Sequence, residues 1–166
     1  MSIRRIASSI AVWVWAATAA SQACAVIVTR ADGQPMNPVG EPFSMKGPFT
    51  ISKGAIQANC VMTLNGTVGP TGVLTVTSAQ FAGAGLCALA TGSANSALPW
   101  TGQFDNTFRL QLNNMALSVN LLGGCGPGIV AANWTNPSSA TFVNAVLSPN
   151  CEVAGSLVTS PQLQVQ

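Results

Sequence analysis

The chain has 166 residues, of which 48% are hydrophobic and only 6% charged, with a formal net charge of +2. It contains no histidine, which excludes a histidine-based catalytic triad, a histidine general base and histidine metal ligands. About a quarter of the residues of a typical globular domain are charged, so this surface must consist mainly of Ser, Thr, Asn, Gln, Gly and Ala. A neutral surface of this kind tolerates self-association or contact with apolar material.

Residues 1–25 have the order of a secretory signal peptide. Two arginines precede an uncharged, mostly apolar stretch from Ile6 to about Ala20, and small residues then lead to Ala23-Cys24-Ala25. The apolar stretch is short for a membrane span of roughly 20 residues, so we expect export with cleavage after Ala25. Lipidation of Cys24 is the alternative, although the residues before it lack the aliphatic side chain of a lipoprotein signal.

The mature chain from Val26 to Gln166 is expected to carry no net charge. Its four bases balance its four acids: Arg30, Lys46, Lys53 and Arg109 against Asp32, Glu41, Asp105 and Glu152. We therefore expect no nucleic-acid partner and no electrostatic attraction to an anionic membrane. No transmembrane segment is expected in the mature chain, and the predicted location is extracellular or the cell surface, with the periplasm as the alternative.

Residues 26–48 are predicted to form an N-terminal arm, because residues 31–48, "ADGQPMNPVGEPFSMKGP", contain four prolines and three glycines. Proline removes a donor from a strand ladder and glycine weakens a strand.

Residues 49–166 are predicted to form a single β-rich domain, because segments rich in Val, Ile, Thr and Phe alternate there with turn residues. The predicted strands are 49–52, 56–68, 73–81, 107–112, 116–121, 129–134, 140–147, 152–159 and 162–165. Short strands at regular spacing predict an all-β fold, an antiparallel sandwich or barrel.

The segment between Cys60 and Cys87 has the pattern of a β-hairpin. Met62, Leu64 and Val68 fall on one face of the first strand and threonines and an asparagine on the other, as a half-buried antiparallel pair requires. We expect the turn at residues 69–72, "GPTG", which leaves two strands of similar length. Asn65-Gly66 is a second hairpin signal within the segment.

The four cysteines of the mature chain are expected to form two disulfides, because the exterior and the periplasm are oxidising. Cys125 to Cys151 repeats the arrangement of Cys60 to Cys87, with intervals of 26 and 27 residues. We interpret the two segments as related hairpin units, each closed by its own disulfide near its open end. Pairings that cross between the units are the alternative, since four cysteines allow three connectivities.

No residue pattern indicates catalysis, a metal site or a cofactor. The chain has no C-x-x-C motif, and its few carboxylates are scattered along the sequence. "GGCGPG" around Cys125 lacks the Lys-Ser/Thr of a phosphate-binding loop. Trp100 and Trp134 are the only tryptophans of the expected mature chain. They are interpreted either as core residues or as surface residues that contact an apolar partner.

Several short motifs resemble those of small exported bacterial proteins known as protein activator of alkane oxidation. The resemblance covers residues 47–166 and rests on the following motifs: "GPFTIS" at 47–52, "NC" at 59–60, "LNGTV" at 64–68, "SAQFAGAGLC" at 78–87, "ALPW" at 97–100, "GGCGPG" at 123–128 and "VAGSL" at 153–157. It implies a non-enzymatic secreted factor that helps cells use long-chain alkanes at the cell surface, in biofilm or at an oil–water interface. It supplies no catalytic residues.

Two functions remain open from the sequence. The first is a secreted accessory protein that promotes alkane oxidation by contact with apolar or cell-surface material. The second is a fimbrial or biofilm-matrix subunit that self-associates by strand pairing, using the N-terminal arm and the alternating "LQVQ" at 163–166. Neither function is that of an enzyme.

Overall fold

The computed structural model describes residues 26–166, and the predicted signal peptide with Cys24 lies outside them. The described chain forms eleven strands and one short 3-10 helix. The strands are β1 (Val28–Arg30), β2 (Glu41–Lys53), β3 (Ile56–Val68), β4 (Val73–Ala82), β5 (Ala90–Gly92), β6 (Trp100–Asn106), β7 (Arg109–Val119), β8 (Gly123–Thr135), β9 (Ser139–Leu147), β10 (Cys151–Ser160) and β11 (Leu163–Val165), and the helix is η1 (Gly85–Leu89).

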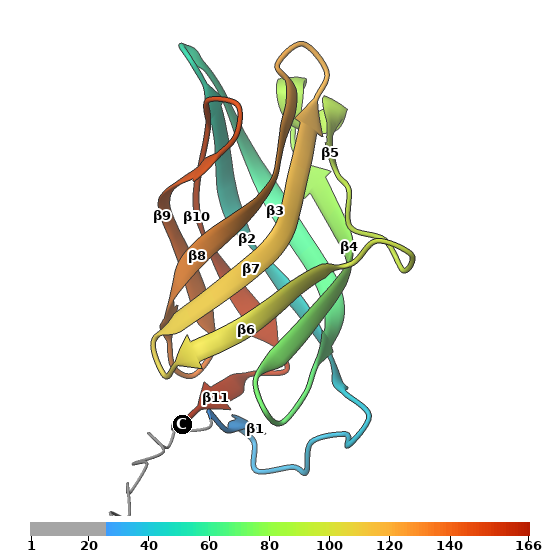
Figure 1. The fold of residues 1–166 in the computed structure, drawn as a ribbon, viewed down its shortest axis with the longest axis vertical. Coiled ribbons are helices and arrows are strands. Elements are labelled where there is room, and N and C mark those ends of the chain that lie inside the picture. The colour runs from blue at the N-terminus through green and yellow to red at the C-terminus, as the bar shows by residue number, and fades with distance from the viewer. Residues whose placement is uncertain (1–25) are drawn as a thin grey trace, which may run out of the picture.

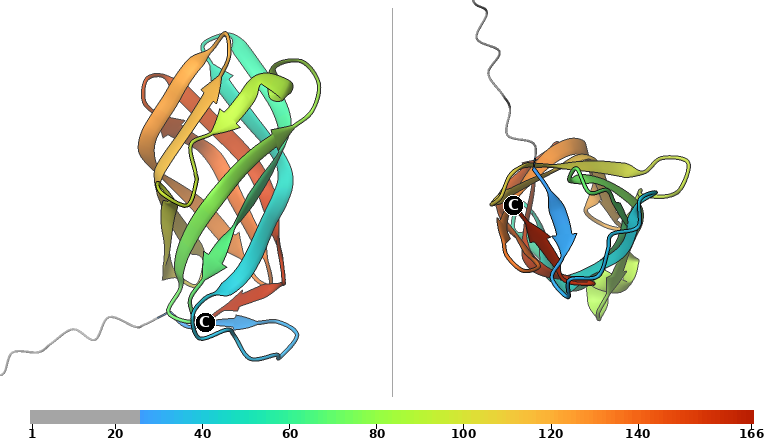
Figure 2. Two further views of the ribbon diagram at one scale, coloured as in Figure 1. Left: turned by 90° about the vertical axis from the view of Figure 1, so that its right-hand side faces the viewer. Right: turned by 90° about the horizontal axis from the view of Figure 1, so that it is seen from below.

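Eight antiparallel strands close into a barrel (Figures 1 and 2). Their order is β7-β6-β4-β3-β2-β10-β9-β8, and β8 pairs with β7 to complete the circle. The short strand β5 pairs with the upper part of β7, whereas β6 pairs with its lower part. The prediction of an all-β antiparallel fold is confirmed, and the fold is the barrel rather than the sandwich.

The inside of the barrel is filled by the apolar side chains of the alternating strands. In β3, Met62, Leu64 and Val68 are fully buried, as the hairpin pattern predicted. The largest fully buried side chains, from six strands, are Trp100, Phe49, Phe104, Phe142, Met45, Ile51, Met62, Leu64, Leu74, Leu110, Leu112 and Met115. An eight-stranded barrel is just wide enough for side chains to fill it, and burial of this apolar area is the main stabilising term.

The N-terminal arm is shorter than predicted, because β2 already begins at Glu41. Phe43 and Met45 are buried in the core, so the structure places residues 41–48 in a central strand and not in an arm. Pro42 lies beyond the last residue of β2 that pairs with β10, and the β10 ladder is interrupted opposite Pro48. At both prolines β2 is not paired with β10, so no backbone N–H is required there for that ladder. The rule that excludes proline from central strands therefore gave a wrong prediction for this segment.

Residues 26–40 run beneath the lower end of the barrel, where β1 pairs with β11 in a separate two-stranded sheet (Figure 2). Arg30 joins this sheet to the barrel: its guanidinium lies 2.6 Å from Glu41 Oε1 in β2 and 2.6 Å from Asp32 Oδ2. The arm and the C-terminal strand thus pair with each other.

The predicted hairpin turn at residues 69–72 is confirmed, and it lies between β3 and β4. Asn65-Gly66 is instead the site of a register shift between these strands. β7 runs unbroken from Arg109 to Val119 with a bulge between Leu112 and Met115, so the strands predicted at 107–112 and 116–121 are one. β1, β5 and β6 were not predicted, because these segments are short or rich in polar residues.

Candidate functional site

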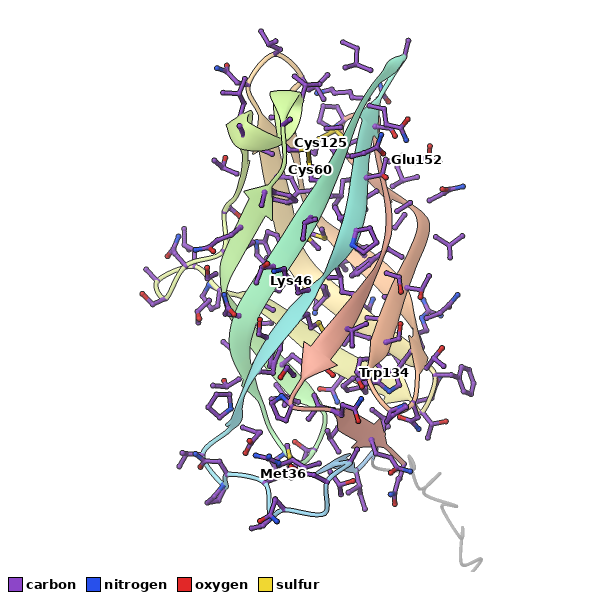
Figure 3. All side chains as sticks on the ribbon, turned by 180° about the vertical axis from the view of Figure 1, so that it is seen from behind. Met36, Lys46, Cys60, Cys125, Trp134 and Glu152 are labelled. Carbon is purple, nitrogen blue, oxygen red and sulfur yellow. A yellow bond between two sulfur atoms is a disulfide. The ribbon has the colours of Figure 1, made fainter. Side chains whose placement is uncertain are left out.

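Both disulfides lie at the upper end of the barrel, opposite β1 and β11 (Figure 3). Cys60 in β3 is bonded to Cys87 in η1, with Cα atoms 5.4 Å apart. Cys125 in β8 is bonded to Cys151 in β10, with Cα atoms 5.8 Å apart. This is the pairing that the spacing favoured, and each bond closes a hairpin at its open end.

The two tryptophans are buried and do not form a surface site. Trp100 is 0% exposed, and its indole Nε1–H donates to Ser93 Oγ at 3.0 Å. Trp134 is 3% exposed, donates to Asn136 Oδ1 at 2.8 Å and packs edge-on against Phe104. Of the two interpretations of Trp100 and Trp134, the structure supports core packing and contradicts contact with an apolar partner, because the barrel covers both rings and residues just beyond strand ends accept from both indole donors.

Exposed apolar side chains lie at both ends of the barrel: Ile27, Val39, Val73 and Phe108 at the lower end, and three aliphatic residues at the upper end. Ile56 follows the turn between β2 and β3, Leu89 ends η1, and Leu121 lies in the turn between β7 and β8. Their exposed fractions are 49%, 44% and 81%. We call these three residues the apolar end. Leu121 also has a φ of +73°, a left-handed conformation that is unfavourable for a bulky side chain.

The connections that carry the apolar end are tied to one another. The backbone N–H of Asn120 donates to the carbonyl of Leu89 at 3.2 Å. Lys53 Nζ, beside the β2–β3 turn, donates to the carbonyl of Gly124 at 3.1 Å. Together with the two disulfides, these bonds tie to one another the connections that carry the three exposed side chains.

Charged residues are concentrated away from the apolar end. Five of the eight charged residues of the described chain lie at the lower end, namely Arg30, Asp32, Glu41, Asp105 and Arg109, and two, Lys53 and Glu152, lie near the upper end. At the lower end, the hydrogen bonds from Arg30 hold the pKa of Asp32 down, from the ordinary 3.8 to about 2. The upper end is thus the less charged one.

A second apolar surface lies on the outside of the barrel, where residues 93–99 leave the wall between β5 and β6. It is a groove of about 580 Å³ lined by Ser93, Ala97, Leu98, Pro99, Thr101, Asn114, Ala116 and Pro127. A smaller hollow of about 240 Å³ continues it over β5, β7 and β8 and shares Ser93 and Ala116 with it. We call the two together the outer groove.

Within residues 26–166, no helix is long and apolar enough to cross a membrane. The same residues contain no group of three or more acidic or cysteine side chains placed to hold a metal ion.

Comparison with known families decides the relationship. The family described as Alkane oxidation protein activator PraA/PraB-like matches residues 4–166. The chain belongs to this family. The match extends the resemblance found in the motifs from residue 47 to nearly the whole chain. No curated protein and no solved structure matches it.

The sequence did not reveal the apolar end or the outer groove. Single exposed aliphatic residues are common on protein surfaces, so nothing in the amino-acid sequence indicates that Leu89 and Leu121 lie at the same end of the fold. The fold of the barrel brings the connections that carry them to the same end. The one available signal was a leucine pair at 121–122 in a turn, a position that ordinarily takes polar residues.

Proposed function

We propose that this protein is an exported, non-enzymatic accessory factor that promotes alkane oxidation by contact with apolar material. The observation that carries the proposal is the apolar end, three exposed aliphatic side chains on connections that two disulfides hold in place. The family description supplies the process, alkane oxidation. Two disulfides are also compatible with export, because such bonds persist in oxidising compartments.

Contact at the apolar end is driven by burial of apolar area, at about 25 cal/mol per Å². A chain with four acids and four bases in residues 26–166 pays little electrostatic cost when it approaches an alkane droplet or a cell surface. Binding of this kind is nearly insensitive to salt, because there is no attraction between opposite charges for ions to screen.

The alternative is a fimbrial or biofilm subunit that exchanges strands, and it requires a strand or a sheet edge that is free to pair with another copy. β1 and β11, the two terminal strands, already pair with each other along three residues, and the barrel closes on itself. A donated strand would have to displace one of these pairings, since a closed barrel presents no free edge.

Growth on hexadecane tests the proposal. Cells that lack the gene are expected to grow more slowly on hexadecane, and purified protein added to the medium should restore growth. Growth on a water-soluble carbon source should be unchanged, which is the control for a general defect. Equal growth of the two strains on hexadecane would contradict the proposal, as would chemical conversion of hexadecane by the purified protein alone.

A further inference from the structure

The floor of the outer groove is made of small residues on the outer faces of three strands. Ala116 in β7 lies at its centre, where the groove and the smaller hollow meet. Thr91, Ser118 and Gly124 continue the floor in register across β5, β7 and β8. Because these side chains are short, a ligand can approach the barrel wall closely along this line.

Two bulges shape the wall beside this floor. β7 carries one extra residue next to Asn114, which has a φ of +61°, and β8 carries another at Gly126, with a φ of +88°. A side chain at Gly126 would collide with the backbone of Met115, so this position requires glycine. Bulges of this kind often lie next to binding sites, where they redirect a strand or a side chain.

The loop of residues 93–99 forms the facing wall and is fixed by Asn95. The side-chain oxygen of Asn95 accepts hydrogen bonds from the N–H groups of Ala97 and Leu98, both at 2.9 Å, and its amide donates to the carbonyl of Ser93 at 3.0 Å. Ser93 N–H in turn donates to the carbonyl of Ala116. Leu98, 72% exposed, therefore stands over the floor in a preformed wall.

We propose that the outer groove binds one unbranched alkyl chain. No charged side chain lines it, so the ligand it fits is apolar and uncharged. Its volume of about 580 Å³ lies within the roughly 300–1,000 Å³ of small-molecule sites. The groove and the hollow share Ser93 and Ala116, and a linear ligand can extend from one into the other more easily than a compact one.

The polar groups of the groove allow the chain to carry a terminal hydroxyl. Ser93 Oγ accepts the indole hydrogen of Trp100, which leaves its own hydrogen to donate. The chain can therefore come from an alkane or from the primary alcohol that oxidation of an alkane yields. This inference rests on the proposed function and gives it a ligand class, but it places the ligand on a different surface from the apolar end.

Nuclear magnetic resonance of the labelled protein tests the proposal, with decane and 1-decanol as separate probes. We expect saturable shifts of the Trp100 indole signal and of the backbone N–H signals of Ser93, Ala116 and Gly126. The Trp134 indole, bonded to Asn136 at the other end of the barrel, should not move. Shifts with 1-decanol alone would assign the site to the alcohol, and shifts with both probes to the alkyl chain itself.

Ala116→Phe fills the groove and should weaken binding at least about tenfold. Ala131→Phe is the matched control, because Ala131 is partly exposed on β8 outside the groove. The affinity of this variant for the probe should equal that of the wild type. Leu98→Ser, at an exposed loop position where folding is not at risk, should weaken binding severalfold.

Three results would overturn the inference: no saturable shift with either probe, equal affinity in Ala116→Phe, or the same shifts on raising protein concentration without a probe. The last would make the groove a contact between copies of the chain. Growth on hexadecane separates this inference from the proposed function. A protein that restores growth but binds neither probe refutes the groove ligand alone.

Discussion

The indole Nε1–H of Trp100 donates a hydrogen bond to Ser93 Oγ, 3.0 Å away, and so bonds a residue of the barrel interior to one that lines the outer groove. The ring is fully buried, while Ser93 begins the loop that forms the groove wall. Packing of the core and the position of the loop are therefore linked through one hydrogen bond.

Replacement of Trp100 should lower stability. Trp100→Ala should cost about 3–5 kcal/mol, because it leaves a cavity in the core. Trp100→Phe keeps most of the ring, so it should cost less, although it removes a hydrogen bond worth about 1 kcal/mol. Urea unfolding measures both. A Trp100→Ala protein as stable as the wild type would mean that the side chain is not a core residue.

Leu121→Asn should change stability and adsorption in opposite directions. Leu121 has a φ of +73°, and asparagine tolerates this conformation better than leucine does, so we expect a gain of about 0.5–1 kcal/mol. The same change removes the most exposed side chain of the apolar end and should weaken adsorption to hexadecane. Chemical unfolding and droplet adsorption, measured on the same sample, check the two signs. A variant that loses both stability and adsorption would indicate a structural role only.

Joint replacement of Cys60 and Cys87 by alanine should leave Cys125–Cys151 oxidised. Loss of one disulfide that closes a loop of this length, with a sequence separation of 27, should cost about 3.5 kcal/mol in the chain-entropy model. The wild-type protein should contain no free thiol among residues 26–166. Peptide mapping and thiol titration measure both quantities, and a peptide that joins Cys60 to Cys125 would refute the pairing.

The contribution of Asp32 to the free energy of unfolding should change with pH only under strongly acidic conditions. Its pKa is lowered in the folded protein from 3.8 to about 2, so its contribution is fully present above about pH 4 and is lost as the pH falls through about 2. Asp32→Asn should remove this part of the acid dependence. Thermal unfolding of both proteins between pH 2 and about 7 checks it, and identical acid profiles would contradict the expectation.

Much of the barrel could be predicted from the alternation of apolar residues. The bounds of β3 were predicted to the residue, and those of β4, β9 and β10 to within one residue, because apolar and polar residues alternate there. The strand predicted at 129–134 is wrong at its start, because β8 already begins at Gly123, in a glycine-rich segment that indicated a turn. The predicted strand at 49–52 was shorter than β2 because Pro42 and Pro48 indicated a loop. Both prolines lie where β2 does not pair with β10. The choice between sandwich and barrel depends on the β7–β8 pairing that closes the sheet, and no local pattern carries that information.

The candidate surfaces were much less predictable than the fold. Tryptophan is the usual anchor of an apolar contact, yet Trp100 and Trp134 are buried in the barrel and have hydrogen-bond partners in the connections next to it. The residues left outside are leucines and an isoleucine on separate connections, distant in sequence. Their placement at one end of the barrel depends on strand directions, so it becomes visible only in three dimensions.

Adsorption to hexadecane droplets is the most direct test of the account, measured for the wild type, for Leu89→Asn with Leu121→Asn, and for Phe108→Asn at low and high ionic strength. Phe108 is the matched control, since it is 66% exposed in the turn at the lower, more charged end. We predict that the double variant loses at least about tenfold in adsorption, as burial of two leucine side chains implies. The wild type and Phe108→Asn should adsorb alike at both salt concentrations. An equal loss in Phe108→Asn, or adsorption abolished by moderate salt, would contradict contact through the apolar end.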